Sequence, residues 1–243
     1  MIRESFELRG MIGTPPFADN ISRIYLNELD DSELVDLIQD TGYEKGDAYG
    51  FTVDETERDL LSGYLLLTRP VIQKVYTEET QSVEDREIQT VEKIPFRVDF
   101  KYGLLEVFAD QNSSSNITNK LGQLTNWETT IENVNFSPQG VMNTIEDGYE
   151  TELTSIKISN YSVTDSVVGD FSVDIDDQEV GERLLSDHTG KVSYLGVRVK
   201  TDVDSVTLGI YDSGSIVVYN EMEGLTEILD SIKESTMGGD HSA

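Results

Sequence analysis

Cysteine is absent from this chain of 243 residues, which also has only two histidines and one tryptophan. A chain without cysteine can form no disulfide, no thiolate zinc site and no cysteine nucleophile. Basic residues are scarce as well, because 18 Lys and Arg stand against 47 Asp and Glu. The resulting net charge of −29 at pH 7 is spread along the whole chain, so carboxylates are the background and no acidic cluster stands out by its charge alone.

Long apolar runs are also missing. A membrane-spanning helix needs about 20 apolar residues, and the longest candidate here, Tyr64 to Leu67, is far shorter. The N-terminus, Met1 to Ser5, lacks the basic segment followed by an apolar one that marks a secretory signal. We therefore expect a soluble, cytoplasmic protein with no membrane partner.

The even spread of negative charge indicates a particular solvent. Such a surface repels itself at low salt, whereas molar salt shortens the Debye length to about 3 Å and screens the repulsion. The composition is therefore typical of a protein from a high-salt cytoplasm, such as that of a halophilic archaeon or its virus. The alternative is an ordinary acidic protein from a low-salt organism.

The N-terminal part has apolar residues in patterns that predict both strands and helices. Phe6 to Ile12 alternates like a strand. Ile21 to Leu29, which Asp19 or Asn20 can cap, has the spacing of a helix, and a second helix is expected after a cap at Asp30 to Ser32. From Leu60 the period changes to two. The expected elements there are two paired strands, Leu60 to Leu67 and Val71 to Tyr76, with Pro70 between them, and then an exposed hairpin or a mobile loop from Thr77 to Glu92.

The rest of the chain predicts further hairpins and helices. Strand, turn and strand are expected over Phe96 to Phe108 with the turn at Gly103, followed by a polar loop from Asn112 to Asn116 and a helix through Ile117, Leu121 and Leu124. Further expected elements are strands at 155–159, 171–175, 192–200, 206–211 and 215–219 and helices at 177–185 and 225–232. The pattern predicts an α+β fold of mostly antiparallel sheets with helices on one side. It divides into an N-terminal α+β region (1–92), a C-terminal α+β domain (93–234) and a flexible tail (235–243).

The hairpin Val206 to Tyr219 with its following helix resembles the end of each repeat in the TATA-binding-protein fold. There a hydrophobic strand, a Ser-Gly turn and a second strand precede a long helix. The resemblance covers about thirty residues, with a weaker echo at Phe96 to Leu124. It implies a concave sheet that binds the DNA minor groove and inserts Phe between base steps. Phe100, Phe108 and Tyr219 are the aromatic residues offered for that role, but the scattered Lys and Arg form no basic patch for phosphates.

The same two segments suggest an internal duplication. Aligning Gly103 with Gly214 superposes Leu105 on Ile216 and Val107 on Val218. This alignment predicts a repeated strand–strand–helix unit. The alternative is that any β-hairpin followed by a helix would align equally well.

Catalytic and cofactor motifs are not found. The sequence contains no Gly-x-Ser-x-Gly elbow, no Walker-type phosphate loop and no Gly-x-Gly-x-x-Gly, so no cofactor is expected and an enzymatic role stays open. His188 is the one candidate general base, and a helix C-terminal cap explains its position at least as well. Asp170, Asp174 and Asp176 are the candidate ligands for a hard cation, with Asp174 and Asp176 on one strand face. The alternative is a solvated acidic turn.

These observations leave three candidate functions. The first is a non-enzymatic interaction or assembly protein of a halophilic archaeon or its virus, which binds a protein partner or itself through sheet edges and a helix face. The second is a nucleic-acid-associated factor, in transcription or in defence against mobile elements, with a TATA-binding-like fold. The third is a metal-dependent hydrolase around the three aspartates.

The solvent hypothesis predicts how stability depends on salt. We expect the melting temperature, followed by circular dichroism, to rise between low and molar KCl because the salt screens the repulsion among 47 carboxylates. An equal concentration of betaine, a zwitterion that adds no ionic strength, is the control. A melting temperature that stays level or falls in KCl would contradict the hypothesis.

Overall fold

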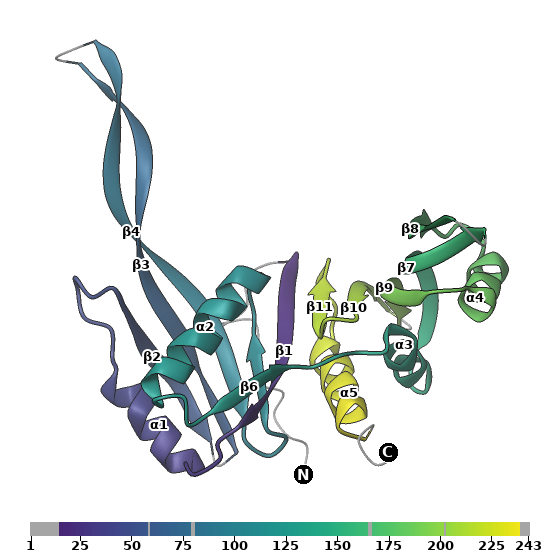
Figure 1. The fold of residues 1–243 in the computed structure, drawn as a ribbon, viewed down its shortest axis with the longest axis horizontal. Helices are drawn as coiled ribbons and strands as arrows, with labels where there is room; N and C mark the ends of the chain where they lie inside the picture. The colour runs from purple at the N-terminus through teal and green to yellow at the C-terminus, as the bar shows by residue number, and fades with distance from the viewer. Residues whose placement is uncertain (1–14, 58, 79–80, 165–166, 202, 239–243) are drawn as a thin grey trace. The chain divides into compact units, whose positions relative to one another are not determined.

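The computed structural model describes residues 15–57, 59–78, 81–164, 167–201 and 203–238, which form eleven strands and five helices (Figure 1). These residues belong to two compact units. Residues 24–107 and 112–131 make up the hairpin unit, and residues 15–23, 108–111 and 132–238 make up the C-terminal unit. Strand β4 (Ser82–Asp99) runs across residues 92 and 93, where the sequence analysis placed a domain boundary. The α+β class with antiparallel sheets is confirmed.

The hairpin unit is an antiparallel sheet with two helices. Its strands follow the order β2 (Tyr49–Glu57), β3 (Leu60–Thr77), β4 and β5 (Leu104–Val107). Helices α1 (Asp31–Asp40) and α2 (Gln111–Leu124) lie over one face of this sheet (Figure 1). The core between the layers is fully buried and includes Leu34, Ile38, Leu61, Leu65, Phe96, Ile117 and Leu121.

The C-terminal unit is built in the same way. Its antiparallel strands follow the order β1 (Phe17–Tyr25), β11 (Ser215–Val218), β10 (Ser205–Tyr211), β9 (Lys191–Lys200), β7 (Glu150–Thr164) and β8 (Val167–Asp174). Helix α3 (Pro138–Glu146) packs against β7, β9, β10 and α5 (Leu225–Gly238). Helix α4 (Gln178–Asp187) packs against β7, and a short strand β6 (Thr130–Asn133) precedes α3.

Several local predictions are confirmed. Asp30 caps α1 in a capping box with Glu33, and its side chain accepts the Glu33 amide at 2.9 Å. This bond lowers the pKa of Asp30. Gly103, at a φ of 61°, closes the β4–β5 hairpin, and the C-terminal hairpin leads into α5 as expected. The polar stretch expected as a loop at Asn112 to Asn116 instead forms the first turns of α2.

Two predictions in the N-terminal part are wrong. The segment expected as a helix from Ile21 is strand β1, in which Asp19, Asn20, Ile21 and Ser22 are buried in succession. A strand buried on both faces shows no alternation of apolar and polar residues, so its spacing can imitate a helix. The strand expected over Phe6 to Ile12 lies outside the described residues.

The second error concerns Pro70, which does not separate two paired strands. Leu60 to Thr77 is one continuous strand, and its partner is β4 along its whole length. The exposed hairpin expected between Thr77 and Glu92 is therefore the far end of the β3–β4 pair. The expected tail is helical as far as Gly238, where α5 ends.

The two halves of the chain have similar element orders. The first half runs β1, α1, β2, β3, β4, β5, α2, and the second runs β6, α3, β7, β9, β10, β11, α5, with β8 and α4 added after β7. The pairing orders β2-β3-β4-β5 and β7-β9-β10-β11 also correspond. Among the described residues, no helix has the length and apolar character needed to cross a membrane.

Candidate functional site

The three aspartates predicted as metal ligands lie at the outer edge of the C-terminal unit. Asp170 and Asp174 are on β8, whereas Asp176 lies in the connection to α4, so the expectation that Asp174 and Asp176 share a strand face is wrong. All three are exposed, and Asp170 accepts the backbone amide of Asn160 at 3.4 Å. In the described part of the chain, no three His, Asp or Glu residues form a group that could hold a metal ion. The metal site stays a prediction.

His188 occupies the position expected of a helix cap. It is the C-cap residue of α4, and its Nδ1 lies 2.7 Å from the carbonyl oxygen of Leu185. An imidazole at this position can donate to one of the carbonyl groups left unsatisfied in the last turn of a helix. The contact therefore accounts for His188 without a catalytic role.

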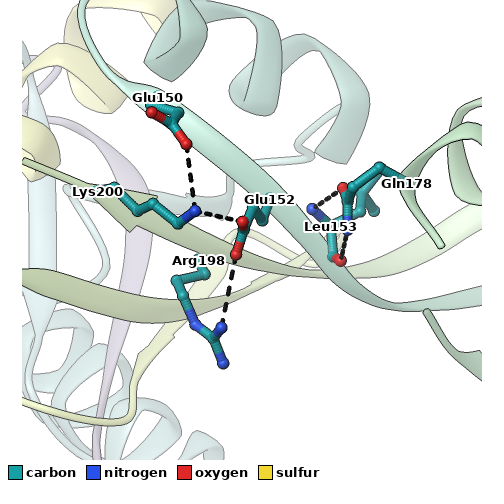
Figure 2. Close-up of polar contacts among 6 residues, drawn as sticks. All are labelled: Glu150, Glu152, Leu153, Gln178, Arg198 and Lys200. Carbon is teal, nitrogen blue, oxygen red and sulfur yellow. Dashed lines mark hydrogen bonds and ion pairs between the residues drawn. The ribbon is translucent and has the colours of Figure 1, made fainter. Parts of the chain in front are cut away.

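A ladder of four charged side chains crosses β7 and β9 (Figure 2). Glu152 lies opposite Arg198 in the strand register, and Glu150 lies opposite Lys200. Lys200 Nζ is 3.1 Å from Glu150 Oε1 and also contacts Glu152, while Arg198 Nη1 is 3.5 Å from Glu152 Oε2. Lys200, chiefly by its hydrogen bond, lowers the pKa of Glu152, and Glu152 raises the pKa of Lys200. Each carboxylate thus faces a cation, which makes the ladder a cross-strand stabiliser.

The same strand β7 has its edge covered by a side chain of α4. The Gln178 amide group donates from Nε2 to the Leu153 carbonyl and accepts the Leu153 amide at Oε1, both at 2.8 Å (Figure 2). Strand β8 pairs with β7 only from Ser155 onward. Gln178 therefore takes the place of a neighbouring strand at the point where β8 ends.

Aromatic side chains gather over β9 and β10 of the C-terminal unit. The rings of Tyr194 and Tyr211 lie opposite each other with centroids 4.7 Å apart, and burial raises the pKa of both phenols. A Cβ at Gly209 would lie 2.9 Å from Cε2 of Tyr194, so glycine is needed where this ring lies against the strand. Tyr219 adjoins the group and is 44% exposed.

A buried ion pair joins β4 and β5 in the hairpin unit. Arg97 donates to Glu106 through Nε at 2.5 Å and through Nη2 at 2.7 Å. The two residues lie directly opposite each other across the hairpin that closes at Gly103. Neither residue is among the site residues predicted from the sequence, because the pattern of residues sets no register for this hairpin. Removing one partner of such a pair leaves a buried charge, which is strongly destabilising.

The most distinctive surface is the far end of the β3–β4 pair. These strands pair residue by residue from Leu60 with Asp99 to Thr77 with Ser82. Strand β2 accompanies β3 only as far as Leu67, and β5 accompanies β4 only from Phe96. Residues 68–77 and 82–91 therefore form a two-stranded ribbon, here called the arm, that projects beyond the other strands and helices of its unit (Figure 1).

The arm exposes large apolar side chains. Ile72 is 70% exposed and Val83 is 62% exposed. The other exposed large apolar residues of the arm are Val71, Tyr76 and Val91. Together they are nearly half of those found in the described part of the chain, although the arm is a small fraction of it. Contiguous exposed apolar surface marks interaction sites in soluble proteins.

A hollow of about 550 Å³ lies at the base of the arm, within the hairpin unit. Its lining is Leu67, Thr68, Arg69, Asn112, Ser115 and Asn116, which includes no carboxylate. Arg69 Nε is bound to Glu92 Oε2 at 2.7 Å, so the one cation of the lining already has a partner. The hollow lies between the first turns of α2 and the start of the arm.

Changing Gln178 to Leu should expose the edge of β7. Replacing a Gln amide with an apolar group of similar size leaves the nearly buried Leu153 peptide groups without these hydrogen bonds. We expect a loss of about 1–3 kcal/mol in the free energy of unfolding, measured by urea denaturation in molar KCl. Glu179→Gln on the exposed side of α4 is the matched control, and equal stability of both variants would contradict the role of Gln178.

Changing Glu152 to Gln should alter the acid limb of the pH–stability profile. Because the pKa of Glu152 is lowered on folding, its stabilising contribution is present above the unfolded pKa and is lost as pH falls through the folded pKa. The variant should therefore be less stable than the parent at neutral pH and low salt, and the difference should vanish at acid pH. The melting temperatures across pH test this, with Glu179→Gln as control. A difference that is constant across pH would contradict it.

Comparison with known proteins identifies no family for this chain. No protein-family description matches the chain, and no curated protein matches its sequence. The function must therefore be argued from the surfaces themselves. Of these, the charge ladder and the buried ion pair are internally satisfied, whereas the arm presents apolar side chains to the solvent.

Proposed function

We propose that this chain is a non-enzymatic protein-interaction or assembly protein that works in the high-salt cytoplasm of a halophilic archaeon or in its virus. The arm is the observation that carries the proposal. An isolated two-stranded hairpin is marginally stable in water, and this one also exposes Ile72, Tyr76 and Val83. Binding to a partner protein would cover these side chains and stabilise the arm.

The charge of the arm favours a protein over DNA. Residues 68–91 contain three basic and five acidic residues, whereas a ribbon that enters a DNA groove needs Lys and Arg to neutralise phosphates. The apolar side chains and the strand edges of the arm suit β-strand addition to a protein partner instead. Molar salt supports such contacts because it screens the repulsion that a chain of charge −29 meets on approaching another acidic protein.

A nucleic-acid-associated factor with a TATA-binding-like fold is the second candidate. The corresponding order of elements in the two halves favours it, because the fold that the chain resembles consists of repeats that each end in a strand–strand–helix unit. Tyr219, the exposed tyrosine of the group over β9 and β10, adds an aromatic ring on which a base could stack. The scarcity of Lys and Arg weighs against this candidate.

Shortening the arm tests the leading proposal. Residues 70–89 would be replaced by Asn-Gly, which joins the directly opposed Arg69 and Thr90 by a two-residue turn. In molar KCl we expect the parent chain, and not the shortened chain, to retain a protein partner that rebinds when both are purified. Fluorescence of Trp127, the single tryptophan, serves to show that the hairpin unit stays folded.

Equal retention of the partner by both chains would contradict the role of the arm. Fluorescence anisotropy with duplex DNA at the same KCl concentration tests the second candidate in parallel. Salt-resistant DNA binding by the shortened chain would favour the second candidate over the first.

A further inference from the structure

The two strands of the arm differ in charge. Strand β3 contains Arg69 and Lys74 and has no carboxylate along its 18 residues, in a chain where acidic residues outnumber basic ones by more than two to one. The arm segment of β4, residues 82–91, has three carboxylates and one arginine. Arg69 is bound to Glu92, so Lys74 is the cation that the outer edge of β3 offers. Lys74 is complementary in charge to Asp85 and Glu87 on the outer edge of β4. Both edges occur on every copy of the chain.

The hydrogen-bonding geometry of the arm leaves both edges open to pairing. The Thr68 amide donates to the Ala48 carbonyl at 3.0 Å, so it points away from β4. Because amides alternate in direction along a strand, those of Ile72, Lys74 and Tyr76 also point outward. Pro70, which has no amide hydrogen, falls in the same outward series, so its presence removes no hydrogen bond between β3 and β4.

The corresponding outward positions on β4 follow from the register. Val83, Asp85 and Glu87 lie opposite Tyr76, Lys74 and Ile72, and residues opposite each other in an antiparallel pair share the same hydrogen-bonding class. In the described part of the chain, β2 is the only other strand beside β3, and β5 the only other strand beside β4, and neither reaches these positions.

We infer that the arm joins copies of this chain to one another, with the outer edge of β3 in one copy pairing antiparallel with the outer edge of β4 in the next. A register that sets Lys74 opposite Glu87 of the neighbour sets Tyr76 opposite Asp85 and Ile72 opposite Gln89. Each outward peptide group then meets another outward group. The exposed side chains of Ile72, Tyr76, Val83 and Val91 share one face of the arm, so those of the two copies come together on one face of a four-stranded ribbon.

This contact uses different surfaces on the two copies, so it can repeat. Such heterologous contacts build closed rings or open filaments, depending on the rotation between neighbours. The inference rests on the proposed function in that it makes a second copy the partner of the arm. If the arm binds a different protein and not a second copy of this chain, the proposed function still holds and this inference is wrong.

The test uses light scattering after size exclusion in molar KCl. The parent chain is expected to show a mass well above the 27.2 kDa of a single chain, rising with concentration. Ile72→Pro removes an outward amide and is compatible with an edge strand, so it should reduce assembly to single chains. Gln73→Thr, at an inward position of the same strand, is the matched control and should assemble like the parent.

A mixing experiment separates the head-to-tail contact from a symmetric one. Asp85→Pro blocks the edge of β4 as Ile72→Pro blocks the edge of β3. Each variant alone should be a single chain, because it lacks one of the two complementary edges. An equal mixture should form dimers and nothing larger, since one intact edge of each kind remains.

Two outcomes overturn the inference. A parent chain that stays at 27.2 kDa up to its solubility limit would mean that Pro70 and Lys74 protect the edge from pairing. Unchanged assembly of Ile72→Pro, with Trp127 fluorescence and circular dichroism like those of the parent, would place any self-association elsewhere on the chain. Neither outcome bears on the proposed function, because the retention assay with the shortened chain tests separately whether the arm binds a different protein.

Discussion

The antiparallel pairing of β3 with β4 is the interaction on which the hairpin unit depends. Over its first eight residues β3 has a second neighbour in β2, and the paired strands hold the core residues Leu61, Leu65 and Phe96 beneath α1 and α2. Beyond Leu67 the same ladder continues without neighbouring strands. One pair of strands therefore serves both as the centre of a packed sheet and as a projecting ribbon.

The two units differ in whether a side chain covers the exposed edge of a strand. In the C-terminal unit, the edge of β7 beyond β8 is covered by the side-chain amide of Gln178, which reproduces the two hydrogen bonds of a strand. In the arm, the outward peptide groups of Ile72, Lys74 and Tyr76 meet no strand among the described residues. Because exposed edges invite pairing with other chains, a protein that covers one edge and leaves another open has a place for a partner.

The net charge of −29 is not evenly distributed over the elements of the folded chain. Carboxylates are spread along the whole chain, yet β3 has none over its 18 residues, and β9, β10 and β11 also have none. Where acidic side chains do meet cations, as in the Glu150–Glu152–Arg198–Lys200 ladder, each is satisfied within the sheet. The proposed contact therefore depends on a projecting strand without carboxylates, and not on a cluster of carboxylates.

The sequence alone determined the elements whose signals are local. The capping box at Asp30, the turn at Gly103, the alternation of β9 and the apolar stripe of α5 all follow from neighbouring residues. Only the tertiary structure decided that Ile21 belongs to a strand, because burial on both faces removes the period-two signal. Only the tertiary structure decided that Pro70 lies within one long strand. A proline is tolerated there because its position points away from β4, and that direction depends on which strand lies beside it. The ion pair of Arg97 and Glu106, the cover that Gln178 provides and the open edges of the arm likewise depend on strand register, which is set by contacts between residues far apart in the chain.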